Sequence, residues 1–306
     1  MPTSSPMRAW LMALLLWLAL VAAPAQAKEV SLKLANLTLL GNLELAEGAS
    51  PKDGVLLMVH GTLRHNATQT EIDLQRNLKE RGVSSLAITL SLGIDGRRGM
   101  FDCNQPIRHL HDDAVEEIAA WVDWLKQQGA NTIWVLGHSR GGNQVALYLL
   151  RRHDPAVKKA VLLAPMSYDP AIAAKKYAKR FGMKLDVALQ AAHTLLKGGR
   201  GDEPVNWRGL IYCRDATGTA RAFLSYHAPR KEFDTPTLLP KLPVPVLVIV
   251  PENEEIYPDL PAKMKEVTRT AGREKIRVMV IKGADHFFTE FASEDVADAV
   301  VEFLKE

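Results

Sequence analysis

TIWVLGHSRGG, at residues 132–142, is an apolar, strand-like run that ends in G-x-S-x-G and passes directly into a helical pattern. The motif consists of Gly137, Ser139 and Gly141. A serine hydroxyl is a weak nucleophile that must be held out on a sharp turn from strand to helix, and the two glycines remove the Cβ atoms that would clash there. Apolar residues at 145 and 147–150 fit a buried helix after the turn. The pattern makes Ser139 a candidate nucleophile.

Strand-like and helix-like segments alternate on both sides of this turn. Strands are predicted at residues 55–59, 84–90, 157–163, 244–250 and 277–281, and helices at 70–81, 113–128, within 260–271 and at 290–304. Asp113 and Glu116 have the spacing of a capping box at the start of one helix. Two short runs, 30–34 and 37–45, look like an antiparallel edge pair. Continuous apolar strands separated by helices predict an α/β fold with a mostly parallel sheet covered on both faces.

Residues 166–240 interrupt the alternation. They begin with two amphipathic helical stretches, 171–181 and 185–196, and continue into a less regular segment with several Gly and Pro residues. An insertion of this length before the last strands is expected to lie over the strand ends as a mainly helical lid. It holds 12 Lys and Arg against 7 Asp and Glu. This positive charge fits a solvated helix surface or, less directly, a site for anionic substrates.

The first 27 residues have the pattern of a signal peptide. Arg8 supplies the positive charge, residues 10–23 form an apolar run, and Ala25-Gln26-Ala27 has the small residues of a cleavage site. The run is short for a bilayer span, which needs about 20 residues. Cleavage between Ala27 and Lys28 would leave one domain, residues 28–306, with no membrane span, in the periplasm or secreted. An uncleaved N-terminal anchor is the alternative, and it too implies export.

The composition is that of an ordinary globular protein, with 47% hydrophobic and 24% charged residues. The formal net charge of +3 predicts neither a nucleic-acid partner nor a strongly acidic one. The oligomeric state is left open. The sequence has two cysteines, Cys103 and Cys213, and export makes a disulfide between them possible.

Three separated motifs resemble the α/β-hydrolase superfamily, over about residues 30–303. They are the turn Gly137-His138-Ser139-Arg140-Gly141, the segment His60-Gly61-Thr62 after the first strongly apolar strand, and Gly283-Ala284-Asp285-His286-Phe287-Phe288 after the last. The resemblance implies the α/β-hydrolase fold, a nucleophile at Ser139, an oxyanion-hole loop at residues 60–62 and a catalytic histidine at His286. Ser139 followed by His286 obeys the chain order of the superfamily, which is Ser, acid, His.

Each implied role has a chemical reason. The imidazole of His286 can take the proton of Ser139 as the hydroxyl attacks a carbonyl carbon. The backbone N–H groups of Thr62 and Arg140 are expected to stabilise the negative charge that develops on the carbonyl oxygen. His60 is expected to brace the oxyanion loop, and His138 to pack behind the turn.

The third member is an acid that orients the imidazole, and the sequence offers several candidates for it. The resemblance places it just beyond the strand at 244–250, commonly as Asp in a Gly-x-x-Asp setting. Here the chain reads Pro251-Glu252-Asn253-Glu254-Glu255, and Glu254 is the aligned position. Glu252, Glu255 and Asp169, which follows an earlier strand, remain alternatives. Asp285 is expected to point away from the ring.

These observations predict an exported serine hydrolase that cleaves a carboxylic ester, or a thioester or amide, of a small-molecule or acyl substrate without a cofactor. An acyltransferase or perhydrolase with the same triad, and a non-catalytic binding protein with the same fold, are the alternatives. His109-Leu110-His111-Asp112-Asp113 fits the zinc-hydrolase pattern H-x-H-x-D, but residue 114 is Ala and no companion cluster follows. No metal site is therefore expected.

Overall fold

The computed structural model describes residues 27–270 and 275–306, and within these a sheet of eight strands forms the centre of the fold. The strand order is β1-β2-β4-β3-β5-β6-β9-β10. The strands are β1 (Lys28–Leu34), β2 (Leu37–Glu44), β3 (Val55–Val59), β4 (Ser85–Thr89), β5 (Ile133–His138), β6 (Val157–Leu163), β9 (Val246–Asn253) and β10 (Ile276–Asp285). From β4 to β10 all neighbours are parallel, whereas β1 and β2 form the predicted antiparallel pair at one edge.

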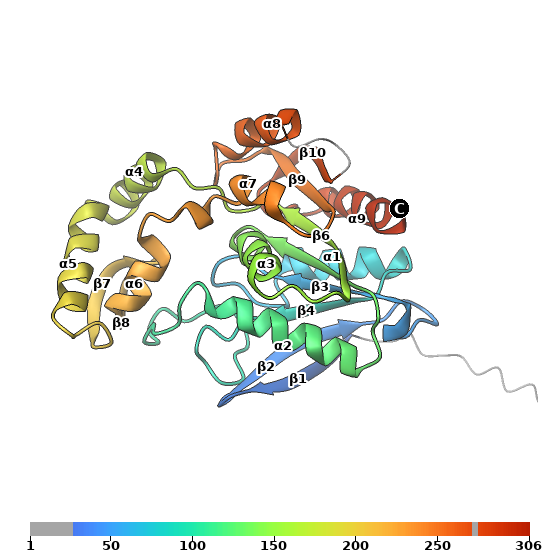
Figure 1. Cartoon of the computed structure of the whole chain (residues 1–306), viewed down its shortest axis with the longest axis horizontal. Helices are drawn as coiled ribbons and strands as arrows, with labels where there is room; N and C mark the ends of the chain where they lie inside the picture. The colour runs from blue at the N-terminus through green and yellow to red at the C-terminus, as the bar shows by residue number, and fades with distance from the viewer. Residues whose placement is uncertain (1–26, 271–274) are drawn as a thin grey trace, which may run out of the picture.

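Helices cover both faces of the sheet, as predicted (Figure 1). On one face lie α2 (Asp113–Gln127), α3 (Arg140–Arg151), α7 (Thr235–Leu238) and α8 (Leu260–Thr270), and on the other α1 (Gln69–Glu80) and α9 (Phe291–Lys305). Alternate residues of the inner strands enter the two separate cores: in β3, Val55 and Leu57 enter one, and Leu56 and Met58 the other. This two-sided burial is why the strands are apolar without a polar alternation.

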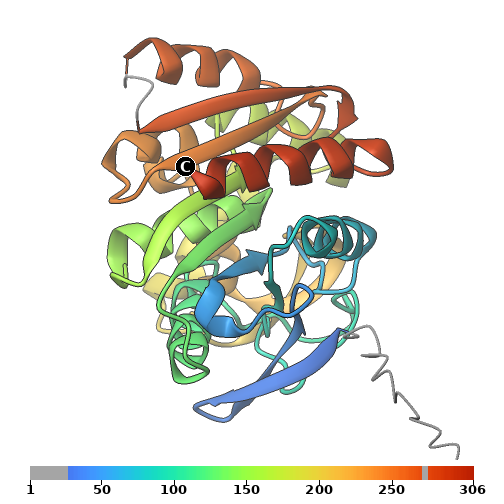
Figure 2. The same ribbon diagram turned by 90° about the vertical axis from the view of Figure 1, so that its right-hand side faces the viewer.

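Figure 2 shows α1 and α9 side by side on their face of the sheet, where Asn77 Nδ2 donates to Ser293 Oγ at 2.8 Å. The helix and strand assignments made from sequence lie within a few residues of the observed ones. The predicted capping box is wrong. Asp113 is the first residue of α2, no side-chain cap forms, and Glu116 pairs with Arg152 at 2.7 Å. The Asp113 carboxylate accepts the N–H of Leu110 in the preceding loop.

Most of the residues between β6 and β9 form a second lobe at one end of the sheet (Figure 1). The two expected helices are α4 (Pro170–Phe181) and α5 (Leu185–Lys197). The less regular segment after them is a hairpin, β7 (Pro204–Leu210) and β8 (Cys213–Thr219), followed by α6 (Ala220–His227). The lobe has its own hydrophobic cluster, whereas Phe233, Leu238 and Leu239 pack in the main core. The lobe therefore ends before residue 233 rather than at 240.

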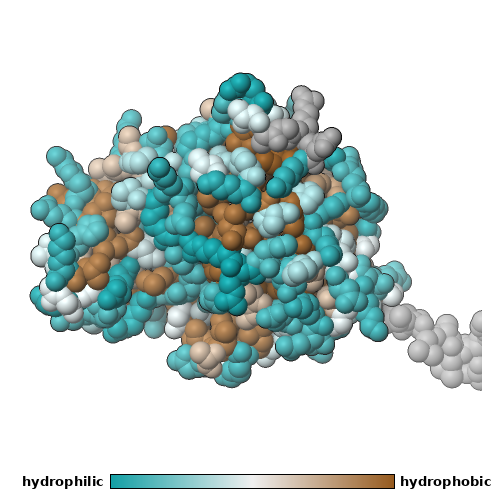
Figure 3. Space-filling view, in the orientation of Figure 1, coloured by the Kyte–Doolittle hydropathy of each residue, from teal (hydrophilic) through white to brown (hydrophobic). Residues whose placement is uncertain are grey.

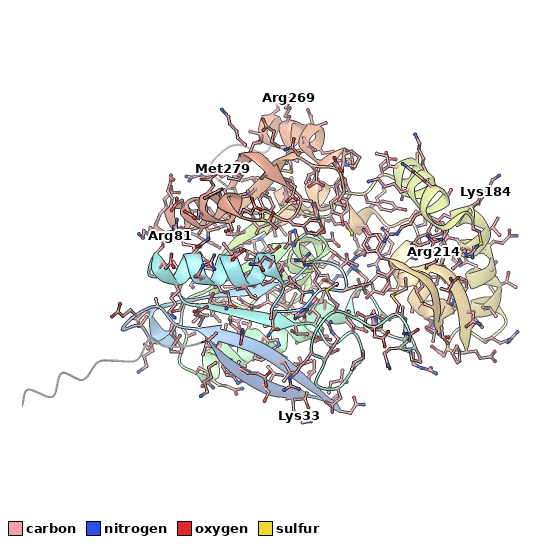
Figure 4. The ribbon with its side chains drawn as sticks, turned by 180° about the vertical axis from the view of Figure 1, so that it is seen from behind. Lys33, Arg81, Lys184, Arg214, Arg269 and Met279 are labelled. Carbon is pink, nitrogen blue, oxygen red and sulfur yellow. A yellow bond between two sulfur atoms is a disulfide. The ribbon has the colours of Figure 1, made fainter. Side chains whose placement is uncertain are left out.

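The lobe is attached to the loop before α2 by a disulfide, by backbone pairing and by hydrogen bonds to α6. Cys103 and Cys213 form a disulfide, and Ile107 pairs with the hairpin by donating its N–H to Thr217 O at 2.8 Å and accepting the N–H of Thr219 at 3.1 Å. The disulfide lies close to Arg214, which Figure 4 labels within the lobe. These links restrain the hairpin end of the lobe.

The surface seen in Figure 3 is mostly hydrophilic, and its hydrophobic side chains lie in separate patches, one of them over the lobe. No helix in the described ranges is long and apolar enough to span a bilayer. The predicted signal peptide lies outside the described residues, apart from Ala27. β1 begins at Lys28, directly after the predicted cleavage point.

Candidate active site

Ser139 lies at a strained turn between β5 and α3. Its backbone has φ 57° and ψ −120°, a conformation that L-residues rarely adopt. Two hydrogen bonds to the end of β6 hold the turn, from Ser139 N–H to Leu163 O at 2.8 Å and from Met166 N–H to Ser139 O at 2.9 Å. These bonds maintain the strained conformation, which places the side chain at the carboxyl edge of the sheet.

The two glycines of the turn are required by close backbone contacts. A Cβ atom on Gly137 would lie 2.4 Å from the carbonyl oxygen of Gly141, and one on Gly141 would lie 2.5 Å from that of His60. Both distances are shorter than any Cβ contact that a folded chain tolerates. The sequence argument that these positions need a missing Cβ agrees with this geometry.

His286 follows β10 and contacts Ser139. Its Nε2 lies 2.9 Å from Ser139 Oγ. Behind it, His138 donates from Nε2 to the carbonyl oxygen of His286 at 2.8 Å. Burial lowers the pKa of His138 to about 3, so this ring stays neutral and acts as a fixed donor. His138, expected only to pack behind the turn, also joins the turn to the histidine loop.

Glu254 follows β9 and contacts the other nitrogen of the imidazole. Its Oε2 lies 2.8 Å and its Oε1 3.0 Å from His286 Nδ1. Oε1 also accepts the N–H groups of Ile256 and Tyr257, both at 2.8 Å, and the carboxylate side chain is fully buried. These bonds hold the longer glutamate side chain in one orientation. A hydrogen-bonded chain thus runs from Ser139 through His286 to Glu254.

The other acids considered from sequence lie elsewhere. Glu252 is exposed and accepts the N–H of Gly283 at 2.8 Å, and Glu255 is exposed on the next turn. Asp169 caps α4 by accepting the N–H of Ile172 at 2.9 Å. Asp285 accepts the N–H of Phe287 and points away from the imidazole ring, as expected. The structure brings none of these carboxylates to His286.

Thr62 and Arg140 line a small pocket beside Ser139. Within the described chain, no protein acceptor is recorded for the backbone N–H of either residue. Gly61 approaches Ser139 closely, since a Cβ on Gly61 would lie 3.4 Å from that of Ser139. Two free N–H groups beside a serine hydroxyl form the arrangement that stabilises an oxyanion.

His60 and Arg97 brace this loop from behind. His60 donates from Nδ1 to Gly61 O at 2.7 Å and accepts the N–H of Leu90 on Nε2 at 3.0 Å. Burial holds the pKa of His60 well below its usual range, so the ring stays neutral. Arg97 donates to the carbonyl oxygens of Leu90 and Arg64 at 2.8 and 2.7 Å. Sequence reasoning missed Arg97 because it lies in the loop at 93–104, which has no periodic pattern.

The residues of the H-x-H-x-D motif have separate roles in packing. His109 bonds to Tyr226 Oη at 2.7 Å, and His111 bonds to Asn143 Oδ1 at 2.9 Å. Asp112 pairs with Arg230 at 3.0 Å. The motif therefore connects the start of α2 to α3 and to the lobe.

Tyr257 is a further residue that the sequence did not single out. Its ring contacts that of His286 edge-on, with centroids 5.5 Å apart. Burial raises the pKa of its hydroxyl, and a hydrogen bond with the Ser139 side chain opposes the rise. The only sequence signal was its position three residues after Glu254.

Comparison with known proteins supports the same assignment of fold. A family model described as the alpha/beta hydrolase family matches residues 56–299. The bifunctional esterase/perhydrolase DCH of Acinetobacter calcoaceticus is 28% identical over 174 residues, in an alignment that covers 49% of this chain. The chain spans only 59% of the length of that curated relative.

Solved structures with low sequence identity share the architecture. Est1E from Butyrivibrio proteoclasticus is 19% identical with a TM-score of 0.63, covering 90% of this chain and 97% of that one. Dienelactone hydrolase from Anabaena variabilis is 19% identical with a TM-score of 0.54, covering 92% and 97%. The family match extends over more than half of the chain. The protein therefore belongs to the alpha/beta hydrolase family.

Proposed function

We propose that the protein is a serine hydrolase that cleaves a carboxylic ester, with Ser139 as nucleophile, His286 as general base and acid, and Glu254 as the orienting carboxylate. The observation that carries this proposal is the hydrogen-bonded chain from Ser139 Oγ to His286 Nε2 at 2.9 Å and from His286 Nδ1 to Glu254 at 2.8 Å. Membership of the alpha/beta hydrolase family supports it. A thioester or amide substrate would use the same groups.

The reaction follows from these contacts. Ser139 Oγ attacks the carbonyl carbon while its proton passes to Nε2 of His286. The N–H groups of Thr62 and Arg140 bind the oxyanion, and the ester C–O bond then breaks as His286 returns the proton to the departing alcohol. Water attacks the acyl-enzyme, His286 takes its proton, and the acid leaves as Ser139 regains a proton. No cofactor takes part in these steps.

A second reaction uses the same intermediate. The relative from Acinetobacter calcoaceticus is named a bifunctional esterase/perhydrolase. If hydrogen peroxide or an alcohol replaces water in the second half, the product is a peracid or a new ester. Competition between water and added peroxide for the acyl-enzyme, measured as peracid per acid released, distinguishes perhydrolysis from hydrolysis.

Labelling with a fluorophosphonate tests the serine mechanism against a non-catalytic binding role. The wild-type protein is expected to react once per chain, and Ser139→Ala not at all, because only an activated serine reacts. Ser139→Ala is also expected to lower the hydrolysis of p-nitrophenyl acetate by about 10⁴-fold with an unchanged circular dichroism spectrum. A folded variant that keeps more than about a tenth of the activity would exclude Ser139 as nucleophile.

The proposal includes export and cleavage after Ala27. Such cleavage would leave β1 whole, because this strand begins at Lys28. The disulfide between Cys103 and Cys213 is typical of an oxidising compartment and supports export. N-terminal sequencing of the protein from the periplasm or medium is expected to give Lys28 as first residue. An unprocessed protein in the cytosolic fraction would contradict this part of the proposal.

A further inference from the structure

A cavity of about 490 Å³ lies between the second lobe and the carboxyl edge of the sheet. Its walls come from α4, the hairpin turn, α6 and the loop after β9, and most of the side chains are apolar or aromatic. Arg140 and Tyr257, which flank Ser139 and His286, form part of the lining. The cavity therefore reaches the neighbours of both residues, while Ser139 and His286 themselves lie outside its lining.

Arg140 lines both this cavity and the small pocket at Thr62, so it lies where the two meet. Its Nε donates to Thr62 Oγ1 at 3.1 Å, its Nη1 donates to His111 Nδ1 at 3.2 Å, and it lies 5.3 Å from the ring centroid of Tyr226. In the described part of the chain, neither a carboxylate partner nor any bond of its Nη2 is recorded. Arg140 is held in place as a cation without a counterion.

The acceptors that orient Arg140 are neutral. His111 donates from Nε2 to Asn143 Oδ1 at 2.9 Å, which leaves Nδ1 free to accept from the guanidinium. Burial and the nearby charge of Arg140 hold the pKa of His111 well below its usual range. The network therefore fixes the orientation of the guanidinium but leaves its charge uncompensated. A partly buried charge of this kind is costly unless something pairs with it.

Further cations line the same cavity. Lys176 donates only to the carbonyl oxygens of Glu255 and Ile256, at 3.3 and 2.6 Å, and Arg180 lies over the ring of Tyr212 at 4.7 Å. Lys179 is also part of the lining. Within the described residues, no ion pair is recorded for any of these three. The cavity is thus positively charged over a mostly apolar wall.

The two carboxylates of the lining are already engaged. Asp169 accepts the N–H of Ile172 at 2.9 Å, and Asp259 bonds to Ser167 Oγ at 2.5 Å and to Lys263 at 2.8 Å. They lie at helix starts and pair away from Arg140. The positive charge at Arg140 is therefore available to a ligand.

We propose that the cavity binds esters that carry a second, ionised carboxylate, and that the free Nη2 edge of Arg140 binds this carboxylate while Ser139 attacks the ester. The inference rests on the proposed hydrolase function. A guanidinium matches the planar geometry of a carboxylate with two parallel N–H donors, and the apolar wall accommodates the carbon skeleton between the two groups. Specificity for acidic esters is thus assigned to the residue directly after the nucleophile.

The test compares charged and neutral forms of one ester. In mono-p-nitrophenyl adipate the second carboxylate is on the acyl side of the ester, and in 4-acetoxybenzoate it is on the alcohol side. The methyl ester of each compound has the same skeleton without the negative charge. The wild-type protein is expected to prefer the acid of at least one pair by about 10-fold or more in kcat/KM. Arg140→Met, which keeps an apolar stem, is expected to lower that preference by about 10- to 100-fold, and Arg140→Lys by less.

Arg214→Met is the matched control. Arg214 is an exposed cation on β8 of the same lobe and is outside the cavity lining, so its loss tests for a general effect of charge. The preference for the acid is expected to stay unchanged in this variant. Hydrolysis of both methyl esters with no preference for either acid in the wild type would overturn the inference and leave the hydrolase proposal intact.

Binding provides a readout that does not depend on turnover. Calorimetry with Ser139→Ala is expected to show binding of mono-p-nitrophenyl adipate or 4-acetoxybenzoate, and the double variant with Arg140→Met is expected to bind about 10-fold more weakly or worse. Equal binding by the two variants, or none by Ser139→Ala, would overturn the inference. If the wild type hydrolyses neither these esters nor p-nitrophenyl acetate and is not labelled by fluorophosphonate, but binding depends on Arg140, the hydrolase proposal fails and the anion site stands.

Discussion

Glu254 meets His286 with both of its carboxylate oxygens, at 2.8 and 3.0 Å from Nδ1, although glutamate is one methylene longer than the aspartate that the resemblance places here. The backbone N–H groups of Ile256 and Tyr257 also donate hydrogen bonds to Oε1. The turn after β9 thus presents two donors that hold the longer side chain against the imidazole.

Glu254→Gln is expected to lower kcat for p-nitrophenyl acetate by about 10⁴-fold, because an amide at this position favours the wrong imidazole tautomer. Glu252→Gln is the matched control, since it makes the same change two residues away in an exposed side chain. Glu255→Gln and Asp169→Asn complete the series. If Asp169→Asn proved the most damaging of the four, the assignment of Glu254 would be wrong.

Gly141→Ala is expected to destabilise the fold by about 2 kcal/mol or more and to abolish labelling by fluorophosphonate. The new methyl group would lie 2.5 Å from the carbonyl oxygen of His60, so the turn and the oxyanion loop must move apart. Urea denaturation measures the first effect. Gly198→Ala serves as control, because its Cβ would meet its nearest neighbour at an ordinary 3.4 Å, and a comparable loss there would remove the steric explanation.

Stability is expected to fall as the pH rises through about 7 because of Glu117. Burial raises the pKa of this carboxyl from 4.5 to about 7, while hydrogen bonds from Ser91 and the charge of Arg97 oppose the shift and Asp113 adds to it. The folded state therefore holds a proton between about pH 4.5 and 7 that the unfolded chain has released. The stabilisation is complete below pH 4.5 and is lost above 7, and its loss costs about 3 kcal/mol.

Glu117→Gln is expected to remove this part of the pH dependence, since its amide bonds to Ser91 without titrating. Urea denaturation at intervals from pH 5 to 8 measures the free energy of unfolding of the variant and the wild type. Burial also raises the pKa of Glu71 to about 7, but Glu71 is present in both proteins, so its contribution cancels in the difference. Glu116→Gln, on the exposed side of α2, is the control. Parallel curves for wild type and Glu117→Gln would contradict the prediction.

Reduction of the disulfide is expected to lower the free energy of unfolding by roughly 2–5 kcal/mol, because the bond closes a long loop, with a sequence separation of 110. Denaturation with and without a thiol reductant measures the loss. The double variant Cys103→Ser, Cys213→Ser should match the reduced protein and be insensitive to reductant. Two free thiols per chain in the denatured, unreduced protein would exclude the bond.

Much of the fold follows from local patterns. The apolar runs at β3, β5, β6 and β9 predicted buried parallel strands, because burial on both faces leaves no polar alternation. The β7–β8 hairpin was missed because half of its residues face solvent and its turn has no Asn-Gly or Asp-Gly signal. Local patterns cannot report pairing that depends on a disulfide and on the long-range partner Ile107.

The site residues likewise fall into those that the local sequence pattern predicts and those that it does not. Ser139, Thr62 and His286 come directly after strand ends, where the sequence pattern itself marks the edge of the sheet. Arg97, Tyr257 and the side chain of Arg140 act through contacts made across the chain, to His60, His286 and His111. Those contacts exist only once the loops are folded together. The choice among Glu252, Glu254 and Glu255 likewise depended on which carboxylate the turn directs inward.

The disulfide also changes the covalent connectivity of the chain. Residues 103–213 form a closed ring that contains Ser139, and two tails leave it, one of which carries Glu254 and His286. A single proteolytic cut anywhere in the ring, including in the exposed helices α4 and α5, opens the ring without dividing the molecule. A nicked protein therefore stays one molecule on a non-reducing gel, with its nucleophile still attached to the loops that activate it.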